Sequence, residues 1–306
     1  MNPSRYGPFP YSPITRRPPL AWPNGARVAV WVNPNIEFFR LDDVMPSNLN
    51  ERVPREHAKV PSVRNWALRD FGNRVGVWRI MKVLSKYGVR ATTALNSEVC
   101  DHHPQIVEEA LKLGWELMGH GQTNAMRINE ASPEQERDYI FGTLDRIERA
   151  SGVRPTGWLG PGLAETWRTL EVLSEAGVRY CCDWINDEQP YTMDVGSPRM
   201  VSLPYSVQTN DVPAYFEMKA SVPEFERTLK DQFDQLYADS EGSGRVMAIA
   251  VHPFVTGQAH RIRALDAALD HICSHGGAWL ATGAEIVAHY QQSEFARLEQ
   301  VQRRVR

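Results

Sequence analysis

The sequence has few cysteines and no long hydrophobic run, and both absences narrow the classes of protein that it fits. Its four cysteines show no CxxC spacing, which favours reduced thiols over a disulfide framework or a zinc ribbon. No apolar stretch approaches the roughly 20 residues that a membrane span needs. Residues 1–23 contain many prolines and lack the apolar core of a secretory signal. We therefore expect a cytoplasmic protein without a membrane partner.

The sequence also lacks a large excess of acidic or of basic residues. The net charge at pH 7 is -3, and no run of lysine or arginine stands out, so there is no electrostatic case for nucleic acid. No glycine-rich dinucleotide or phosphate-binding fingerprint follows the first expected strand. These absences favour a small-molecule substrate. With 306 residues and no linker-like block, we expect one domain over residues 26–306, preceded by an extended arm over residues 1–25.

What the sequence does contain is a repeated order of amphipathic helix, glycine and short apolar strand. This alternation predicts a parallel sheet with helices outside it. Ser132, Pro133 and Gln135 form the N-cap, first-turn proline and capping-box arrangement of a helix start. The segments with strand character are residues 27–33, 89–95, 115–119, 178–182, 200–204, 246–251 and 278–282. Seven or eight strands favour a closed or nearly closed α/β barrel over an open doubly wound sheet.

Two long stretches, residues 40–74 and 206–222, lack a clear period. Irregular segments of this length inside a compact domain are usually functional. We expect both to form loops that roof a pocket at the carboxyl end of the barrel. The arm's prolines favour an extended path over the surface or over a partner subunit, and with it a homo-oligomer.

Polar residues follow the expected strands, at the edge where α/β barrels carry their chemistry. Glu37 stands beside two phenylalanines, and an apolar surround would raise its pKa and make it a better base. His252 follows the cleanest apolar strand and suits a general acid. Asp183 follows a third strand. Cys181 and Cys182 are an alternative nucleophile, although buried cysteine is a common core residue.

A set of metal ligands is not evident. His120 lies between two glycines after its strand, but position 124, where a second histidine would complete a pair, is Asn124. A hydrolytic metal needs at least three close N or O ligands. We therefore predict a site with no metal and no other cofactor, in which His120, Asn124 and Trp184 bind substrate.

These motifs, in this order, resemble the polysaccharide deacetylase (NodB-homology) superfamily from about residue 28 to residue 290. The superfamily's adjacent base and metal ligand resemble Glu37-Phe38, and its histidine pair resembles His120 and Asn124, so two ligands are replaced. The segments Asn35-Ile36-Glu37, Gly157-Trp158, Asn186 to Tyr191 and His252-Pro253 resemble the branch of cofactor-free allantoinases and cyclic imide hydrolases.

The resemblance implies a distorted (β/α)7–8 barrel that opens a C–N bond in a small cyclic amide or imide. It adds Asn35, Trp158 and Asp187 to the expected substrate contacts. In the mechanism we expect, Glu37 deprotonates water and His252 protonates the leaving nitrogen. Asp183 orients His252, and the amides of Gly160 and Gly162 face the oxyanion.

Two alternatives remain open from sequence. One is a metal-dependent N-deacetylase acting on a carbohydrate, with zinc held by Glu37, His120 and one of three further side chains, Asp42, Asp43 or His57. The other is an inactive barrel that only binds a ligand.

Overall fold

The computed structural model describes residues 6–45, 60–126, 128–197 and 199–305. A single sheet forms the centre of this part of the chain, in the order β6-β7-β5-β4-β3-β2-β1-β8, with β9 also paired to β1. The strands are β1 Val28–Ile36, β2 Thr92–Leu95, β3 Glu116–Gly119, β4 Gly157–Trp158, β5 Tyr180–Cys181, β6 Tyr191–Thr192, β7 Val201–Ser202, β8 Arg245–Val251 and β9 Ala278–Leu280.

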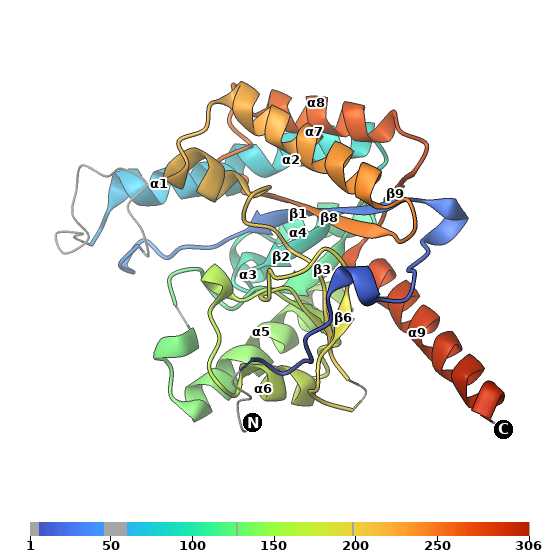
Figure 1. The fold of residues 1–306 in the computed structure, drawn as a ribbon. Helices are drawn as coiled ribbons and strands as arrows, with labels where there is room; N and C mark the ends of the chain where they lie inside the picture. The colour runs from blue at the N-terminus through green and yellow to red at the C-terminus, as the bar shows by residue number, and fades with distance from the viewer. Residues whose placement is uncertain (1–5, 46–59, 127, 198, 306) are drawn as a thin grey trace.

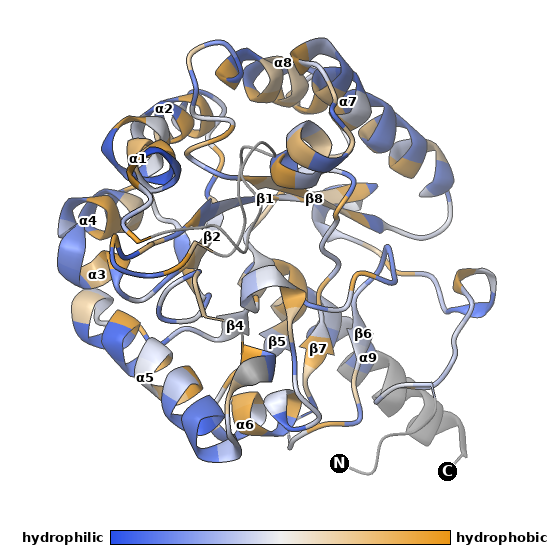
Figure 2. Ribbon diagram, turned by 90° about the vertical axis from the view of Figure 1, so that its left-hand side faces the viewer, coloured by the Kyte–Doolittle hydropathy of each residue, from blue (hydrophilic) through white to orange (hydrophobic). Residues whose placement is uncertain are grey.

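Helices surround the outer side of the curled sheet (Figures 1 and 2). Their bounds are α1 Val63–Phe71, α2 Val77–Lys86, α3 Val99–His102, α4 Pro104–Lys112, α5 Pro133–Ser151, α6 Thr169–Glu175, α7 Val222–Asp239, α8 Ile262–Cys273 and α9 Gly283–Val305. The distorted α/β barrel predicted from sequence is confirmed. No helix in the described part of the chain is both long and apolar enough to cross a membrane.

The barrel is open between the two edge strands of this order, β6 and β8. All described strand pairs are parallel except β6 with β7. Across the gap, Asn210 forms an isolated parallel bridge with Ala250, and the Val246 N–H donates to the Glu188 carbonyl at 2.8 Å. These loop contacts bring residues 206–211 to the carboxyl end of β8.

Strand β1 shows how the sheet divides the core. Val28, Val30 and Val32 pack with the cluster that includes α2, α7 and α8, whereas Ala29 and Trp31 join the cluster inside the barrel. Alternation follows from the two-residue period of a strand. Both faces are apolar because helices cover one and the barrel interior fills the other, so the polar residue that follows β1 is held by a rigid, buried strand.

Helix α5 begins as the sequence predicts. Ser132 and Gln135 form both hydrogen bonds of the capping box, and Gly152 ends the helix with φ 76°. The prediction of a loop over residues 40–74 was wrong for its end, which α1 and a π-helical turn at Gly72–Gly76 occupy; residues 46–59 lie outside the described part of the chain. Strand β1 also runs three residues beyond the predicted Asn33, because Pro34 pairs with Val251 of β8, and Asn35 and Ile36 pair with Ala94 and Leu95 of β2.

The described part of the arm packs on its own barrel. The Gly244 N–H donates to the Leu20 carbonyl at 2.7 Å, and the Arg17 guanidinium holds both carboxylate oxygens of Asp187. A cavity of about 1220 Å³ lies between the arm and the loop that contains Asp187. Its lining does not include Glu37 or His252, so this cavity is separate from the strand ends described next.

Candidate active site

The ends of three nearby strands of the sheet bring the residues that follow them together in a buried cluster. Glu37 follows β1, His120 follows β3 and His252 follows β8. Glu37 Oε1 lies 3.5 Å from His252 Nε2 and 3.8 Å from His120 Nε2, and it accepts a 2.6 Å hydrogen bond from Asn124 Nδ2. The sequence therefore identified Glu37 and the three residues that the fold places around its Oε1 atom.

The surroundings of Glu37 lower its pKa, whereas the sequence predicted a raised pKa. Burial by itself raises the pKa of this carboxyl group, but the charge of His252 and the hydrogen bond of His120 outweigh it, and the pKa falls to about 2. Phe38 was expected to contribute an apolar surround that raises the pKa. That expectation was wrong because the two histidines, and not the adjacent aromatic rings, face the carboxylate.

His252 is held by Asp211, which the sequence analysis placed only in an irregular segment. Asp211 Oδ1 lies 2.7 Å from His252 Nδ1. Its other oxygen accepts hydrogen bonds from the His252 N–H at 2.8 Å and from the Thr256 hydroxyl at 2.6 Å. Burial lowers the pKa of His252, but Asp211 and Glu37 more than compensate and raise it to about 10. The group is therefore an imidazolium near neutral pH.

Asp183 does not orient His252, so this predicted role was wrong. Its Oδ1 accepts a 2.7 Å hydrogen bond from the Gly160 N–H. Burial raises the pKa of Asp183 to about 6, and burial together with Asp183 raises the pKa of Glu165 to about 9. The Gly160 amide is thus already bonded, and Gly162 is exposed, so neither fits the oxyanion role predicted for it.

Asn124 presents an unused acceptor to the site. An ionised carboxylate only accepts hydrogen bonds, so the amide nitrogen of Asn124 must face Glu37. Its carbonyl oxygen Oδ1 is then buried with no hydrogen-bond partner among the described residues. Buried acceptors are rarely left unpaired without a ligand or water. Asn124 therefore suits a substrate that offers an N–H.

Two further residues support Glu37 from the segment that was expected to be a loop. Asn73 Nδ2 donates to the Glu37 carbonyl at 2.9 Å. Arg69 is 4% exposed, and burial lowers its pKa to about 10 although the charge of Glu37 opposes this. Gly76 allows the close approach of this turn to the next loop, since a Cβ there would lie 1.9 Å from the Pro253 carbonyl oxygen. The sequence analysis missed Asn73 and Arg69 because the segment that contains them lacks a clear helical period.

The other predicted substrate contacts lie elsewhere. Trp158 is fully buried in the cluster that includes residues of α5 and α6, so its side chain belongs to the layer outside the sheet. Asp187 pairs with Arg17. Asn35 is 2% exposed within β1, and Trp184 Nε1 donates to Glu165 at 3.1 Å. The structure does not bring Trp158 or Asp187 to Glu37.

The side chains around Glu37 do not supply the three ligands that a hydrolytic metal ion needs. Beside Oε1, His120 Nε2 is a potential ligand at 3.8 Å, but Asn124 presents an amide NH2 group, which is not a metal ligand, and His252 as an imidazolium has no lone pair to offer. Among the described residues, Glu37 belongs to no cluster of three potential ligands. Asp42 is exposed and Asp43 half-buried, and His57 lies outside the described residues.

Comparisons with known proteins agree with this fold. A family model described as polysaccharide deacetylase matches residues 68–181. The chain is 23% identical over 248 residues to the peptidoglycan deacetylase of Helicobacter pylori, covering 71% of this chain and 84% of that protein. It is 26% identical over 293 residues to a protein of Schizosaccharomyces pombe that is provisionally named a polysaccharide deacetylase, covering 87% of this chain and 90% of that one.

Among solved structures, PuuE allantoinase superposes with a TM-score of 0.82 at 23% identity, covering 91% of this chain and 95% of that chain. At this identity the likeness shows the fold alone. Together these matches confirm the resemblance to the polysaccharide deacetylase superfamily that the motifs indicated.

Proposed function

From the relationship to the polysaccharide deacetylases, we propose that this chain hydrolyses a C–N bond in a small cyclic amide or imide without a metal ion. The observation that carries the proposal is the buried pair of Glu37 and His252, 3.5 Å apart, with a base already ionised and an acid already protonated near neutral pH. The allantoinase neighbour, whose name implies a cyclic ureide substrate, supports a ring as the substrate class.

In this mechanism Glu37 removes a proton from a water molecule as its oxygen attacks the ring carbonyl carbon. The C–N bond then breaks, and His252 Nε2 delivers its proton to the departing nitrogen. Asp211 holds the Nδ1 proton of His252 in place at 2.7 Å. General acid and general base steps of this kind typically contribute about 10²–10⁴-fold each.

Negative charge develops on the carbonyl oxygen during the attack. Fixed positive charge in a buried site stabilises such an oxyanion strongly. Arg69, which is buried and acts electrostatically on Glu37, and His252 both supply that charge. They replace the amides of Gly160 and Gly162 in the role expected from sequence.

The ring N–H is the proposed partner of Asn124 Oδ1, the acceptor that has no partner among the described residues. An imide also suits a site without a metal, because its nitrogen is a better leaving group than that of a simple amide. The predicted substrate therefore carries an N–H next to the scissile carbonyl.

Ring opening of succinimide, maleimide, phthalimide, hydantoin, dihydrouracil and allantoin, by enzyme dialysed against a strong chelator, tests the proposal. We expect at least one ring to be opened after chelation. The N-methyl analogue of that ring should react at least about tenfold more slowly, because it leaves Asn124 Oδ1 unpaired. Activity that returns only with added zinc or manganese would contradict metal independence.

A metal-dependent N-deacetylase is the second candidate, favoured by the deacetylases among the relatives. N-acetylated oligosaccharides belong in the same assay with and without zinc. Deacetylation that depends on zinc, with no ring opened, would replace the proposal. Saturable binding of a ring without turnover would indicate the inactive barrel instead.

A further inference from the structure

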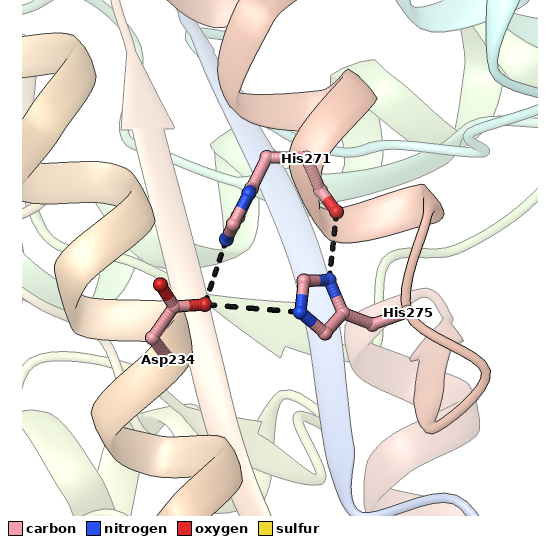
Figure 3. Close-up of side chains that lie close together, drawn as sticks. All are labelled: Asp234, His271 and His275. Carbon is pink, nitrogen blue, oxygen red and sulfur yellow. Dashed lines mark hydrogen bonds and ion pairs between the residues drawn. The ribbon is translucent and has the colours of Figure 1, made fainter.

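Three potential metal ligands lie together on the outside of the barrel, on helices that take no part in the site around Glu37. Asp234 is on α7, and His271 and His275 lie at the carboxyl end of α8 (Figure 3). One ligand atom from each lies within 4.8 Å of the others. His271 Nε2 is 2.7 Å and His275 Nε2 is 4.0 Å from the same oxygen, Asp234 Oδ1.

The two imidazole rings lie close together, with ring centroids 4.7 Å apart. His271 is in the last turn of α8, and His275 lies two residues beyond the end of that helix, in a turn where its N–H donates to the Ile272 carbonyl at 3.2 Å. His275 Nδ1 donates to the His271 carbonyl at 2.9 Å. This bond places the hydrogen on Nδ1 and leaves the lone pair on Nε2, which faces Asp234. Hydrogen bonds of this kind commonly orient metal-binding histidines.

The distances leave room for an ion after small side-chain movements. Ligands about 2.0–2.2 Å from a tetrahedral zinc ion are themselves about 3.3–3.5 Å apart. The observed separations of 2.7 Å and 4.0 Å lie on either side of that value. Side-chain rotation of His271, which is 28% exposed, and of Asp234, which is 51% exposed, would equalise them.

The surroundings favour a cation over an empty surface. The carboxyl end of a helix carries partial negative charge, and α8 ends at Cys273, between the two histidines. Phe233 packs edge-on against both imidazoles, with ring centroids 6.1 Å from His271 and 5.1 Å from His275. In the described part of the chain, these two histidines are the basic side chains within 4.0 Å of the Asp234 carboxylate. The two imidazole rings therefore pack against Phe233 and remain partly exposed to solvent.

We propose that Asp234, His271 and His275 form a binding site for a divalent transition-metal ion of the zinc class, with water completing the coordination. Two imidazoles and one carboxylate are ligands that zinc accepts readily. The ion joins α7 to α8, so its role is to stabilise this helix pair. The site is independent of the ring-opening chemistry.

The test is calorimetric titration of the chelator-treated full-length protein with Zn²⁺, repeated with Co²⁺ for its absorption spectrum. The wild type should bind one ion at this site and unfold at a higher temperature when it is loaded. His275→Ala should weaken that binding at least about 100-fold, since even the loss of residues that only orient a ligand costs 10–100-fold. His260→Ala is the matched control, because it removes a surface histidine that precedes the opposite end of α8.

Two further variants separate the outcomes. Asp234→Asn keeps the shape of the side chain and should also weaken Zn²⁺ binding and remove its effect on the melting temperature. His120→Ala should leave both unchanged. The inference is overturned if the wild type binds no Zn²⁺, if His275→Ala and Asp234→Asn bind it as the wild type does, or if only His120→Ala abolishes binding, which would place the ion at the Glu37 site.

Discussion

Two pairs of buried titratable groups follow neighbouring strands, and burial leads to opposite results in them. Glu37 and His252 carry opposite charges, and each stabilises the charged form of the other, with pKa values of about 2 and about 10. Asp183 and Glu165 are both acids, and the pKa of each rises, to about 6 and about 9. The cost of removing a charge from water is common to both pairs, so the neighbour decides the protonation state.

This difference also separates chemistry from support. Across the neutral pH range Glu37 stays ionised and His252 stays protonated. Asp211 maintains this state through its contact with His252 and has no described contact with Glu37. In the Asp183–Glu165 pair the pKa of both carboxyl groups is raised, and the two side chains accept hydrogen bonds from the Gly160 amide and the Trp184 indole. We infer that the first pair reacts, whereas the second shapes the adjacent strand ends.

The largest expected effect comes from breaking the first pair at its base. Glu37→Gln cannot take a proton from water, so kcat should fall at least about 10³-fold. The variant should still fold, because glutamine retains an oxygen that can accept the hydrogen bond from Asn124. Steady-state kinetics on the ring identified in the panel, with circular dichroism as the folding check, measures this. Turnover within tenfold of the wild type would rule out Glu37 as the base.

A smaller effect is expected when only the support of His252 is changed. Asp211→Asn removes one of the two negative charges that raise the pKa of His252, so this pKa should fall towards neutrality. Above it the acid is lost, and kcat/KM should decline with rising pH in the range 6–9, where we expect the wild type to be flat. At pH 8 the loss should be about 10–100-fold.

Thr256→Val is the matched control for Asp211→Asn. It removes one hydroxyl hydrogen bond to Asp211 Oδ2 but retains the carboxylate and its contact with Nδ1. Its pH profile should remain close to that of the wild type. If Asp211→Asn also keeps a flat profile from pH 6 to 9, then Asp211 does not set the protonation of His252.

The comparison also explains what could be predicted from sequence. Glu37, His120 and His252 were found because each directly follows an apolar strand, and parallel strands bring such residues to one edge. Asp211 was missed because it does not directly follow a strand and reaches His252 at the opening between the edge strands β6 and β8. Its only signal was a polar pair, Asn210-Asp211, in a long segment after an expected strand.

The pKa of Glu37 was predicted with the wrong sign for a related reason. The sequence shows that Phe38 and Phe39 adjoin Glu37. It does not show that the two histidines that face the carboxylate, which follow strands much later in the chain, lie beside it. Trp158 was misplaced because a two-residue strand does not reveal which face a side chain takes. The fold class, by contrast, depended on many repeated helix and strand signals and was predicted correctly.

The smallest expected effect comes from relieving the second pair. Glu165 has a raised pKa of about 9 in the folded protein and about 4.3 in an unfolded chain. The folded state therefore holds a proton that the unfolded state has released, so the contribution of this group to stability is present below pH 4.3 and is lost as pH rises towards 9.

Glu165→Gln supplies a neutral group that needs no proton and whose NH2 group can donate to Asp183 Oδ2, an atom with no partner among the described residues. Its melting temperature should exceed that of the wild type at pH 8 by about 2–4 °C, the change that about 1 kcal/mol produces, with little difference at pH 4. Glu136→Gln is the control, because Glu136 is an even more deeply buried acid than the half-buried Glu165 but accepts hydrogen bonds from the hydroxyls of Thr166 and Thr169 and should gain nothing at pH 8. A lower melting temperature for Glu165→Gln at pH 8 would mean that the folded protein does not hold Glu165 in its protonated form at that pH, and the contrast between the pairs would then not hold.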